Sequence, residues 1–257
     1  MIFESHAHYD DEKFAKDRDT LLQELLGGAV CNIINVGASL EGTGDSIVLA
    51  EQYAQIYAAA GVHPSDTDVL DEQSFAWLKE QTAHPKVVAV GEIGLDYYWD
   101  KELNVQKRQR YWFARQMELA RETGLPVIIH SRDAAEDTMQ VMKSVHAEEI
   151  PGVIHCYSYS AELAKEFVKM GYFIGVGGVV TFKNARKLKE TVVQTPLERI
   201  LLETDAPYLA PEPYRGKRNQ SGYLTFVAEE IARLKQVSAK EVEEVTCRNA
   251  QELFQIK

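Results

Sequence analysis

The most constraining feature of this sequence is a regular alternation of short apolar runs with longer segments of helical character. Each run has the length of a β-strand, and we expect strands at residues 2–8, 30–36, 56–62, from 87 onward, 126–130, 152–155, 172–176 and 200–204. Strands that alternate with helices, without a Pro/Gly/Ser-rich linker, predict a parallel sheet of the α/β class. In a chain of 257 residues, the pattern predicts a single (β/α)8 TIM-type barrel domain over residues 1–257.

Helical segments separate these runs. Helices are expected at residues 14–26, 44–53, 72–81, 104–122, 183–193 and 224–235, with another between the fifth and sixth strands. A last helix, from Ala239 to Phe254, is one element more than an eightfold barrel needs. Ser238 would cap this helix, and Glu241 would complete a capping box. The barrel is therefore expected to carry an extra C-terminal helix.

Composition restricts where the protein works and what it binds. Three cysteines without a spaced framework indicate a reducing compartment. The N-terminus carries the acidic Glu4 and no basic region, so we expect no signal peptide. No apolar run reaches the roughly 18 residues needed to cross a bilayer. We expect a cytoplasmic monomer with no membrane contact and no obligate protein partner. A net charge of −11 argues against a broad surface for coating nucleic acid, but it permits an enzyme with one local basic loop.

Glu92 is the most unusual polar residue in these runs. It follows the apolar segment Val87–Val90 and stands between Gly91 and Gly94, where a strand gives way to a loop. A glutamate at such a place is costly to bury unless a positive charge meets it. We interpret Glu92 as the bridge between two metal ions of a hydrolase.

His6 and His8 are the first candidates to share such a site. Alternate side chains of a strand lie on the same face, so both imidazoles can point to one place. A lone His-x-His pair occurs often by chance, and two surface histidines are the alternative interpretation.

The position of the other candidates strengthens the metal hypothesis. His130, His155 and Asp205 each end an apolar run, as Glu92 does. In a βα barrel the carboxyl ends of the strands form the active-site face. If each histidine were buried for its own structural reason, their shared position at the strand ends would require several coincidences. His84 and His146 lack this placement, and we expect both to be solvated.

The strand-end motifs together resemble those of the TatD family of metal-dependent deoxyribonucleases, among the amidohydrolase-like barrels. The resemblance covers nearly the whole chain and rests on Ser5–His8, Gly61–Pro64, Gly91–Trp99, His130–Ala134, His155–Ser158, Glu203–Pro211 and Arg215–Asn219. Two positions depart from the family pattern. Glu4 stands where Asp is usual, and Gln220-Ser221 stands where an acidic residue and proline are common.

The resemblance implies a two-metal site. His6, His8, Glu92 and Asp205 would hold one divalent ion, and Glu92, His130 and His155 would hold the second. Imidazole and carboxylate ligands suit Zn, Mn, Co or Ni and tolerate Mg. Two such ions can stabilise the attacking and leaving oxygens of a phosphoryl displacement. Asp205 would act as the general base, with His63 as the next candidate.

Two further residues would face the substrate. His63 ends the third strand, and we expect it to touch a phosphate or a water molecule on the metals; a loop-orienting hydrogen bond is the alternative. Arg132 follows a predicted ligand and could donate a bidentate pair of hydrogen bonds to two phosphate oxygens. A pairing of Arg132 with Asp133 or Glu136 is the alternative.

Aromatic and basic residues near the strand ends could hold nucleic acid. Tyr97 and the two aromatic residues after it could stack on bases, or they could cover the barrel mouth. Arg215, Lys217 and Arg218 form the basic loop after the eighth strand. Lys183, Arg186 and Lys187 are interpreted as a solvated helix face.

The leading hypothesis is a metal-dependent 3′-end exonuclease on single-stranded DNA. The alternative is an amide, lactone or aminoacyl-ester hydrolase, including deacylation of misacylated tRNA. Many small-molecule amidohydrolases bridge their ions with a carbamylated lysine, so a glutamate at position 92 favours the nuclease. A non-catalytic interaction protein is a third hypothesis, and the six retained ligand residues argue against it.

Overall fold

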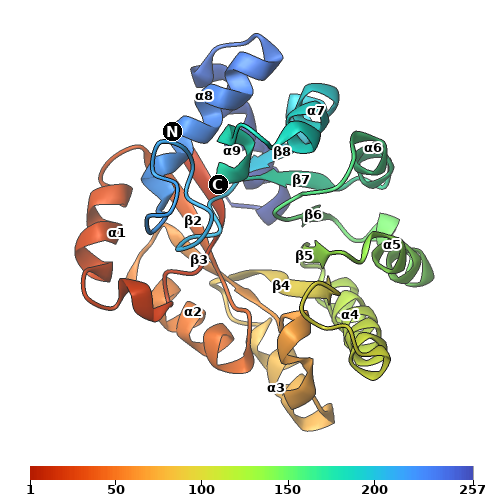
Figure 1. Cartoon of the computed structure of the whole chain (residues 1–257). Coiled ribbons are helices and arrows are strands. Elements are labelled where there is room, and N and C mark those ends of the chain that lie inside the picture. The colour runs from red at the N-terminus through yellow and green to blue at the C-terminus, as the bar shows by residue number, and fades with distance from the viewer. Residues whose placement is uncertain (257) are drawn as a thin grey trace.

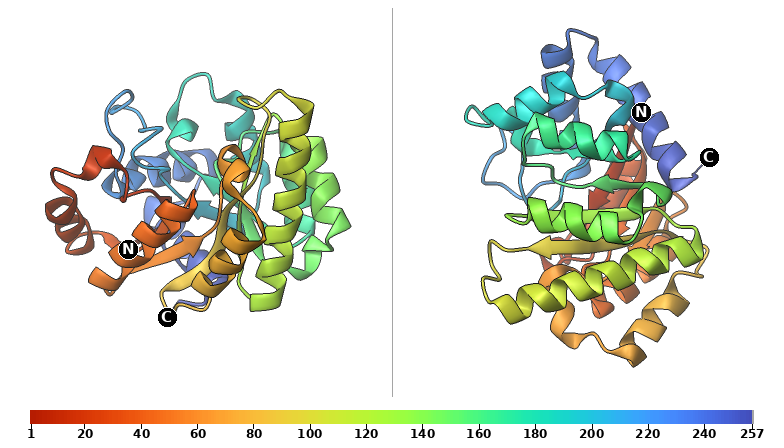
Figure 2. Two further views of the ribbon diagram at one scale, coloured as in Figure 1. Left: turned by 90° about the horizontal axis from the view of Figure 1, so that it is seen from below. Right: turned by 90° about the vertical axis from the view of Figure 1, so that its right-hand side faces the viewer.

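The computed structural model describes residues 1–256 and confirms a (β/α)8 barrel of eight parallel strands in chain order (Figure 1). The strands are β1 (Ile2–Ala7), β2 (Val30–Val36), β3 (Ile56–Ala60), β4 (Val87–Asp96), β5 (Val127–Arg132), β6 (Gly152–Ile154), β7 (Phe173–Val176) and β8 (Ile200–Leu202). The helices are α1 (Arg18–Leu26), α2 (Leu40–Gln52), α3 (Glu72–Gln81), α4 (Leu103–Thr123), α5 (Ala135–Ser144), α6 (Ala161–Lys169), α7 (Arg186–Gln194), α8 (Leu224–Lys235) and α9 (Ala239–Phe254). Helices α1–α8 lie around the outside of the sheet (Figures 1 and 2).

Strand alternation divides the core into two layers. One buried cluster takes a side chain from every strand, for example Phe3, Ile128 and Leu201, and fills the barrel interior. The other cluster contains their neighbours, such as Ile129 and Leu202, and packs the sheet against the helices. Residues two apart in a strand share a face. His130 follows Ile128 by two positions and Glu203 follows Leu201 by two positions, so both also belong to the interior face. The polar ends of the strands thus continue the inner layer.

The barrel closes between β8 and β1 with less backbone pairing than elsewhere. The seven other strand pairs form parallel ladders, whereas this seam has one ladder bridge, between Ala7 and Ala206. The buried carboxylate of Glu4 supplies further links, because it accepts hydrogen bonds from Thr204 N at 2.9 Å and Thr204 Oγ1 at 2.7 Å. A side chain therefore completes the seam.

The extra C-terminal helix is confirmed at the predicted residues, and α9 closes the amino end of the barrel. Phe254 stacks on Phe3 with ring centroids 6.0 Å apart. Ser238 caps the helix by accepting from Glu241 N at 3.1 Å, which is one half of the predicted capping box. Both chain ends lie on one side of the molecule in the right-hand view of Figure 2. No helix within residues 1–256 combines the length and the apolar composition needed to cross a membrane.

Several helix boundaries differ from the sequence-based expectation. The segment 14–26 is split into a 3-10 turn (Glu12–Phe14) and α1. Helix α2 begins at Leu40 rather than residue 44, because Ser39 caps it by accepting from Gly42 N. Helix α6 was not placed from the sequence. Its start is marked by Ser160, whose hydroxyl accepts from Leu163 N, and its apolar spacing is that of an amphipathic helix.

Candidate metal centre

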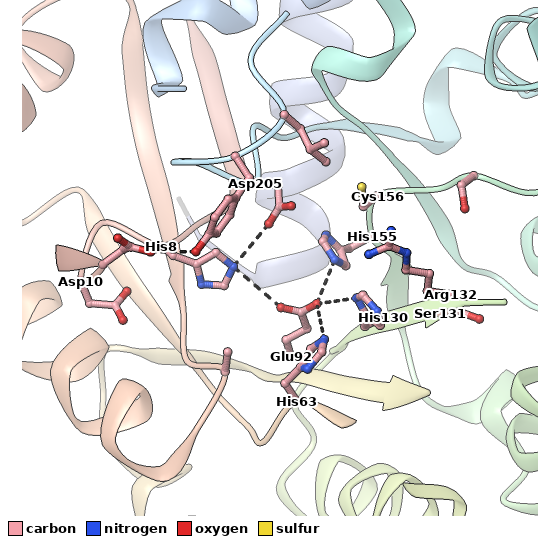
Figure 3. Close-up of a pocket in the computed structure, with 15 residues that line it drawn as sticks. His8, Asp10, His63, Glu92, His130, Ser131, Arg132, His155, Cys156 and Asp205 are labelled. Atoms are coloured by element: carbon pink, nitrogen blue, oxygen red, sulfur yellow. Dashed lines mark hydrogen bonds and ion pairs between the residues drawn. The ribbon is translucent and has the colours of Figure 1, made fainter. Parts of the chain in front are cut away.

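Five of the six residues predicted as metal ligands line one cavity at the carboxyl end of the barrel, and the sixth, His6, is buried next to Glu92 and His8 (Figure 3). The cavity has a volume of about 540 Å³, and Figure 3 shows Glu92 between His8 on one side and His130 and His155 on the other. The six residues are His6, His8, Glu92, His130, His155 and Asp205. Five of them lie in a strand or directly after one, and Asp205 lies three residues after the end of β8.

Glycines allow β4 to bring Glu92 into this position. Gly94 has φ +139°, and a Cβ atom there would lie 1.9 Å from the carbonyl oxygen of His130. A Cβ atom on Gly91 would lie 2.6 Å from Ile128 Cβ. Only glycine permits this close approach of β4 to β5, so the two glycines beside Glu92 are explained by packing.

The first group of ligand atoms surrounds Glu92 Oε2. This oxygen lies 3.4 Å from His6 Nε2 and 3.8 Å from His8 Nε2. Asp205 Oδ1 lies 3.8 Å from His6 Nε2 and 3.4 Å from His8 Nε2, and the two Nε2 atoms are 3.1 Å apart. Four ligand atoms from three separate strand ends therefore converge on one place.

These distances fit a divalent metal ion. Bonds of about 2.0–2.2 Å in a tetrahedral arrangement place ligand atoms roughly 3.3–3.6 Å apart, which lies inside the observed spread. The Nδ1 atom of His8 lies 2.8 Å from Val36 O. A neutral His8 donates its proton to that carbonyl, so that the lone pair of Nε2 faces the group.

The second group surrounds the other carboxylate oxygen, Glu92 Oε1. It lies 2.8 Å from His130 Nδ1 and 3.0 Å from His155 Nε2. The outer nitrogen atoms of these rings face carboxylates, with His130 Nε2 3.1 Å from Asp96 Oδ2 and His155 Nδ1 3.6 Å from Glu203 Oε1. Carboxylates behind metal-ligating imidazoles fix the tautomer and the ring orientation. The arrangement is suited to a second ion.

Three buried polar atoms lie behind the ligand atoms. His6 Nδ1, His155 Nδ1 and Glu203 Oε2 are buried without a hydrogen-bond partner. The rings of His6 and His155 stack with centroids 3.8 Å apart. Ligation through Nε2 would keep the proton of each ring on Nδ1, where Glu203 is the nearby acceptor.

The surroundings of His63 differ from those of the histidines predicted as ligands. Its Nε2 lies 3.7 Å from Glu92 Oε1, while its Nδ1 accepts a hydrogen bond from Ser65 N at 3.2 Å. Burial lowers the pKa of His63 to about 4, so the ring is neutral at pH 7. With Nδ1 accepting, the proton resides on Nε2, and this atom can donate a hydrogen bond into the cavity. With Glu92 and His130, His63 also forms a group whose atoms lie close enough to hold an ion.

Glu92 is ionised despite its burial, with only 4% of its surface exposed. Burial acts to raise the pKa of Glu92. The charge of His155 and the hydrogen bonds from His130 and His155 outweigh that effect and hold the pKa well below its usual range. The site is therefore built to keep a carboxylate charged where cations gather.

Tyr97 is half-buried and less exposed than the two aromatic residues after it, and its contact with substrate stays a prediction. The Tyr97 hydroxyl donates to Asp137 at 2.6 Å and accepts from Arg110 at 2.8 Å, and the half-buried ring packs on the core. Tyr98 and Trp99 are 43% and 68% exposed instead. The reason is the partner Asp137, which lies 40 residues away in sequence and turns Tyr97 inward.

Arg132 lines the metal cavity and stacks on an exposed aromatic ring. Its guanidinium carbon lies 3.9 Å from the centroid of Tyr98. It forms no ion pair with Asp133 or Glu136 among residues 1–256. The side chain is therefore available to an anion at the cavity edge (Figure 3).

The three basic residues after β8 have different surroundings. Arg215 stacks over Phe182, 4.2 Å from the ring centroid. Arg218 donates two hydrogen bonds to the carboxylate of Asp17, from Nη2 at 2.6 Å and from Nη1 at 2.7 Å. Arg218 thus holds its loop against the segment before α1, and its expected contact with substrate stays a prediction. Arg215 and Lys217 form no ion pair within residues 1–256.

Sequence reasoning missed two carboxylates of the site. Asp96 lies four residues after Glu92 and Glu203 two residues before Asp205, and both face ligand histidines. Strand alternation could have identified both, since even spacings share a face. His84 pairs with Glu51 at 3.2 Å, and His146 is exposed; neither reaches the cavity.

A parallel barrel with imidazole and carboxylate groups converging at its strand ends is the arrangement of a metal-dependent hydrolase. Comparison with known proteins agrees. The family model described as TatD related DNase matches residues 3–255. The metal-dependent hydrolase YabD of Bacillus subtilis is 44% identical over 256 residues, covering 100% of both chains. The metal-dependent hydrolase YcfH of Escherichia coli is 37% identical over 260 residues, covering 100% of this chain and 96% of YcfH.

A solved structure gives the same result for the fold. The TatD homologue YjjV of Escherichia coli superposes with a TM-score of 0.92 at 32% identity, covering 100% of this chain and 98% of YjjV. The chain belongs to the TatD family, and it is a metal-dependent hydrolase.

Proposed function

We propose that this hydrolase is a two-metal phosphodiesterase that removes nucleotides from the 3′ ends of single-stranded DNA. The proposal rests on the two carboxylate oxygens of Glu92, which face two separate groups of imidazoles. Two bound divalent ions would stabilise the attacking and leaving oxygens of an in-line phosphoryl displacement. Mg, Mn and Zn are the ions proposed, and the ligands also suit Co and Ni.

Two side chains would handle protons and the phosphate. Asp205 keeps 20% of its side chain exposed to the cavity, so one carboxylate can accept a proton from the attacking water. Burial acts to raise the pKa of Asp205, but the hydrogen bond with His8 and the nearby imidazole charges outweigh it and lower the pKa. His63 would donate from Nε2 to a phosphate oxygen.

Groups at the cavity edge would hold the strand. Tyr98 and Trp99 are exposed beside Arg132, and exposed aromatic rings bind single strands by stacking on bases. On the β8 side, Arg215 and Lys217 can contact phosphates. We also infer that the protein acts as a monomer in the cytoplasm, without an obligate protein partner.

A parallel substrate panel tests the proposal. End-labelled single-stranded DNA, double-stranded DNA, RNA and an aminoacyl-tRNA would be incubated with Mg, Mn or Zn, and with EDTA as the control. Stepwise shortening of single-stranded DNA from its 3′ end is expected. Release of the amino acid with intact DNA would instead favour the aminoacyl-ester hydrolase.

A second experiment tests the basic loop. Arg215 and Lys217 are replaced together by alanine, and DNA affinity is measured against salt concentration. Loss of two phosphate contacts should make the slope of log affinity against log salt shallower by at most about 1.4 for a single strand. Arg218→Ala is the matched control and should keep the slope, because Asp17 already occupies this guanidinium. Hydrolysis of bis(p-nitrophenyl) phosphate should persist in both variants, and its loss would show that the loop shapes the metal site.

A further inference from the structure

A second cavity opens beside the metal cavity and shares four lining residues with it. Its volume is about 350 Å³, and the shared residues are Cys156, Ser158, Asp205 and Leu209. It lies between the loops after β6, β7 and β8 and the first turn of α7, and we name it the α7 cavity. Because Asp205 lines both cavities, a group in the α7 cavity lies next to the reacting bond.

The walls of the α7 cavity suit a flat ring with polar edges. Val179, Leu188 and Leu209 contribute aliphatic surface, and Gly177 leaves bare backbone in the wall. Asn184, a residue with an amide side chain, also lines the cavity. Predominantly apolar pockets with a few polar groups are typical of small-ligand sites, and a nucleobase presents this combination of a π-face and hydrogen-bonding edges.

Two cations without an ion pair line this cavity in a strongly acidic chain. The segment 183–189 holds four basic residues and no acidic one. Lys189 pairs with Glu230 at 2.9 Å, whereas Lys183, Arg186 and Lys187 form no ion pair within residues 1–256. Arg186 and Lys187 line the cavity itself. In a protein of net charge −11, this local positive charge complements an anionic ligand.

We propose that the α7 cavity binds the base of a nucleotide adjoining the cleaved phosphodiester, with a phosphate of that strand against Arg186 and Lys187. The proposal rests on the proposed DNA hydrolysis and names the part of the substrate that this face recognises. It gives the basic start of α7 a role beyond the solvated face expected from the sequence.

The test fills the cavity and compares substrates with and without a base. Val179→Trp, and Ala185→Trp as a second variant, would occupy the cavity. Val193→Trp is the matched control, because Val193 lies on α7 and is 53% exposed outside the cavity. The substrates are single-stranded DNA, the same DNA with an abasic terminal or penultimate nucleotide, and bis(p-nitrophenyl) phosphate.

Filling the cavity should lower kcat/KM on ordinary DNA at least tenfold. The same variants should hydrolyse the small ester normally, and one of the abasic substrates should lose its sensitivity to the variants. The control should match the wild type. Equal losses on ordinary and both abasic DNAs would overturn the base assignment. Failure of the wild type on every DNA, with the small ester still cleaved, would overturn the proposed DNA hydrolysis and the cavity proposal together.

The phosphate part is tested by Arg186→Ala combined with Lys187→Ala. Loss of one phosphate contact should make the slope of log DNA affinity against log salt shallower by about 0.7 for a single strand. Lys143→Ala with Lys165→Ala is the control, since both lysines are exposed on α5 and α6 away from the cavity. An identical change in slope in the two double variants would show that only general charge matters, and the phosphate contact would be dropped.

Discussion

Glu4 offers a quantitative test of how the barrel seam is built. Its side chain has no exposed surface, and Oε1 accepts from His6 N at 3.1 Å and from Thr204 N at 2.9 Å. Oε2 accepts from Thr204 Oγ1. Replacement by glutamine keeps the shape. The amide oxygen can accept from both backbone groups, and the amide nitrogen can donate to the threonine hydroxyl.

The ionisation of Glu4 should cost stability at neutral pH. Burial raises the pKa of Glu4 to about 7, and the hydrogen bonds from Thr204, Ser221 and His6 only partly offset the burial. A carboxyl whose pKa is higher in the folded state favours folding while it is protonated. Its contribution is fully present below the ordinary value of 4.5 and is lost as pH rises through about 7. At about 1.4 kcal/mol per pH unit, the loss amounts to about 3 kcal/mol.

The assay is urea unfolding of wild type and Glu4→Gln at pH 5 and pH 8. EDTA is present throughout, because metal binding has its own pH dependence. The free energy of unfolding should fall by about 2–3 kcal/mol more in the wild type than in the variant between these pH values. Glu229→Gln, on the exposed side of α8, is the control and should follow the wild type. Parallel pH profiles for wild type and Glu4→Gln would refute the reasoning.

Three further predictions concern the ligands and the cysteines. Glu92→Gln should remove much of the affinity for both ions, since a neutral amide bridges cations poorly; two retained ions per chain by metal analysis would contradict the bridge. Asp205→Asn should keep the fold and the ion at the second group while turnover falls roughly 10²–10⁴-fold, and a loss below tenfold at full occupancy would move the base role elsewhere. The thiols of Cys31 and Cys247 lie 3.6 Å apart. Oxidised glutathione should therefore join them and release two reduced glutathiones, with a mass loss of two hydrogens that Cys247→Ser abolishes; three free thiols after treatment would exclude this pairing.

The convergence of the six predicted ligand residues could be foreseen because strand ends are visible in the sequence. His130, His155 and Asp205 end apolar runs, and parallel strands in a barrel present such ends on one face. The pairing of His6 with His8 follows from strand alternation. The sequence could not show how Glu92 divides its two oxygens, because that depends on the packing of β4 against β3 and β5.

Long-range partners explain what the sequence did not reveal. Tyr97 turns inward to Asp137, and Arg218 meets Asp17, 201 residues away. Among three consecutive aromatic residues, or three basic residues in one loop, local sequence does not distinguish the free side chain from the paired one. The same limit applies to the pair Cys31 and Cys247, which packing of α9 on the barrel brings together.

Charge balance at the barrel mouth connects metal binding with protonation. Glu92, Asp96, Glu203 and Asp205 place four carboxylates around the imidazoles, and two divalent ions would match their charge. Without ions, protonated imidazoles supply positive charge. Burial acts to lower the pKa of His8, but the hydrogen bond and charge of Asp205 outweigh it and raise the pKa to about 9.

The pKa values of His130 and His155 are raised in the same way, against the effect of burial, by Asp96 and Glu92 for His130 and by Glu92 and Glu203 for His155. Ligation requires neutral imidazoles, so metal binding at pH 7 should release up to about three protons per chain. Titration calorimetry in two buffers of different ionisation enthalpy measures this number. Above pH 9 the release should decline, because His8 is then already neutral before the metal binds. Metal binding at pH 7 without proton release would show that the ion-free site holds neutral histidines, and the balance of carboxylate charge would then have to come from outside the site.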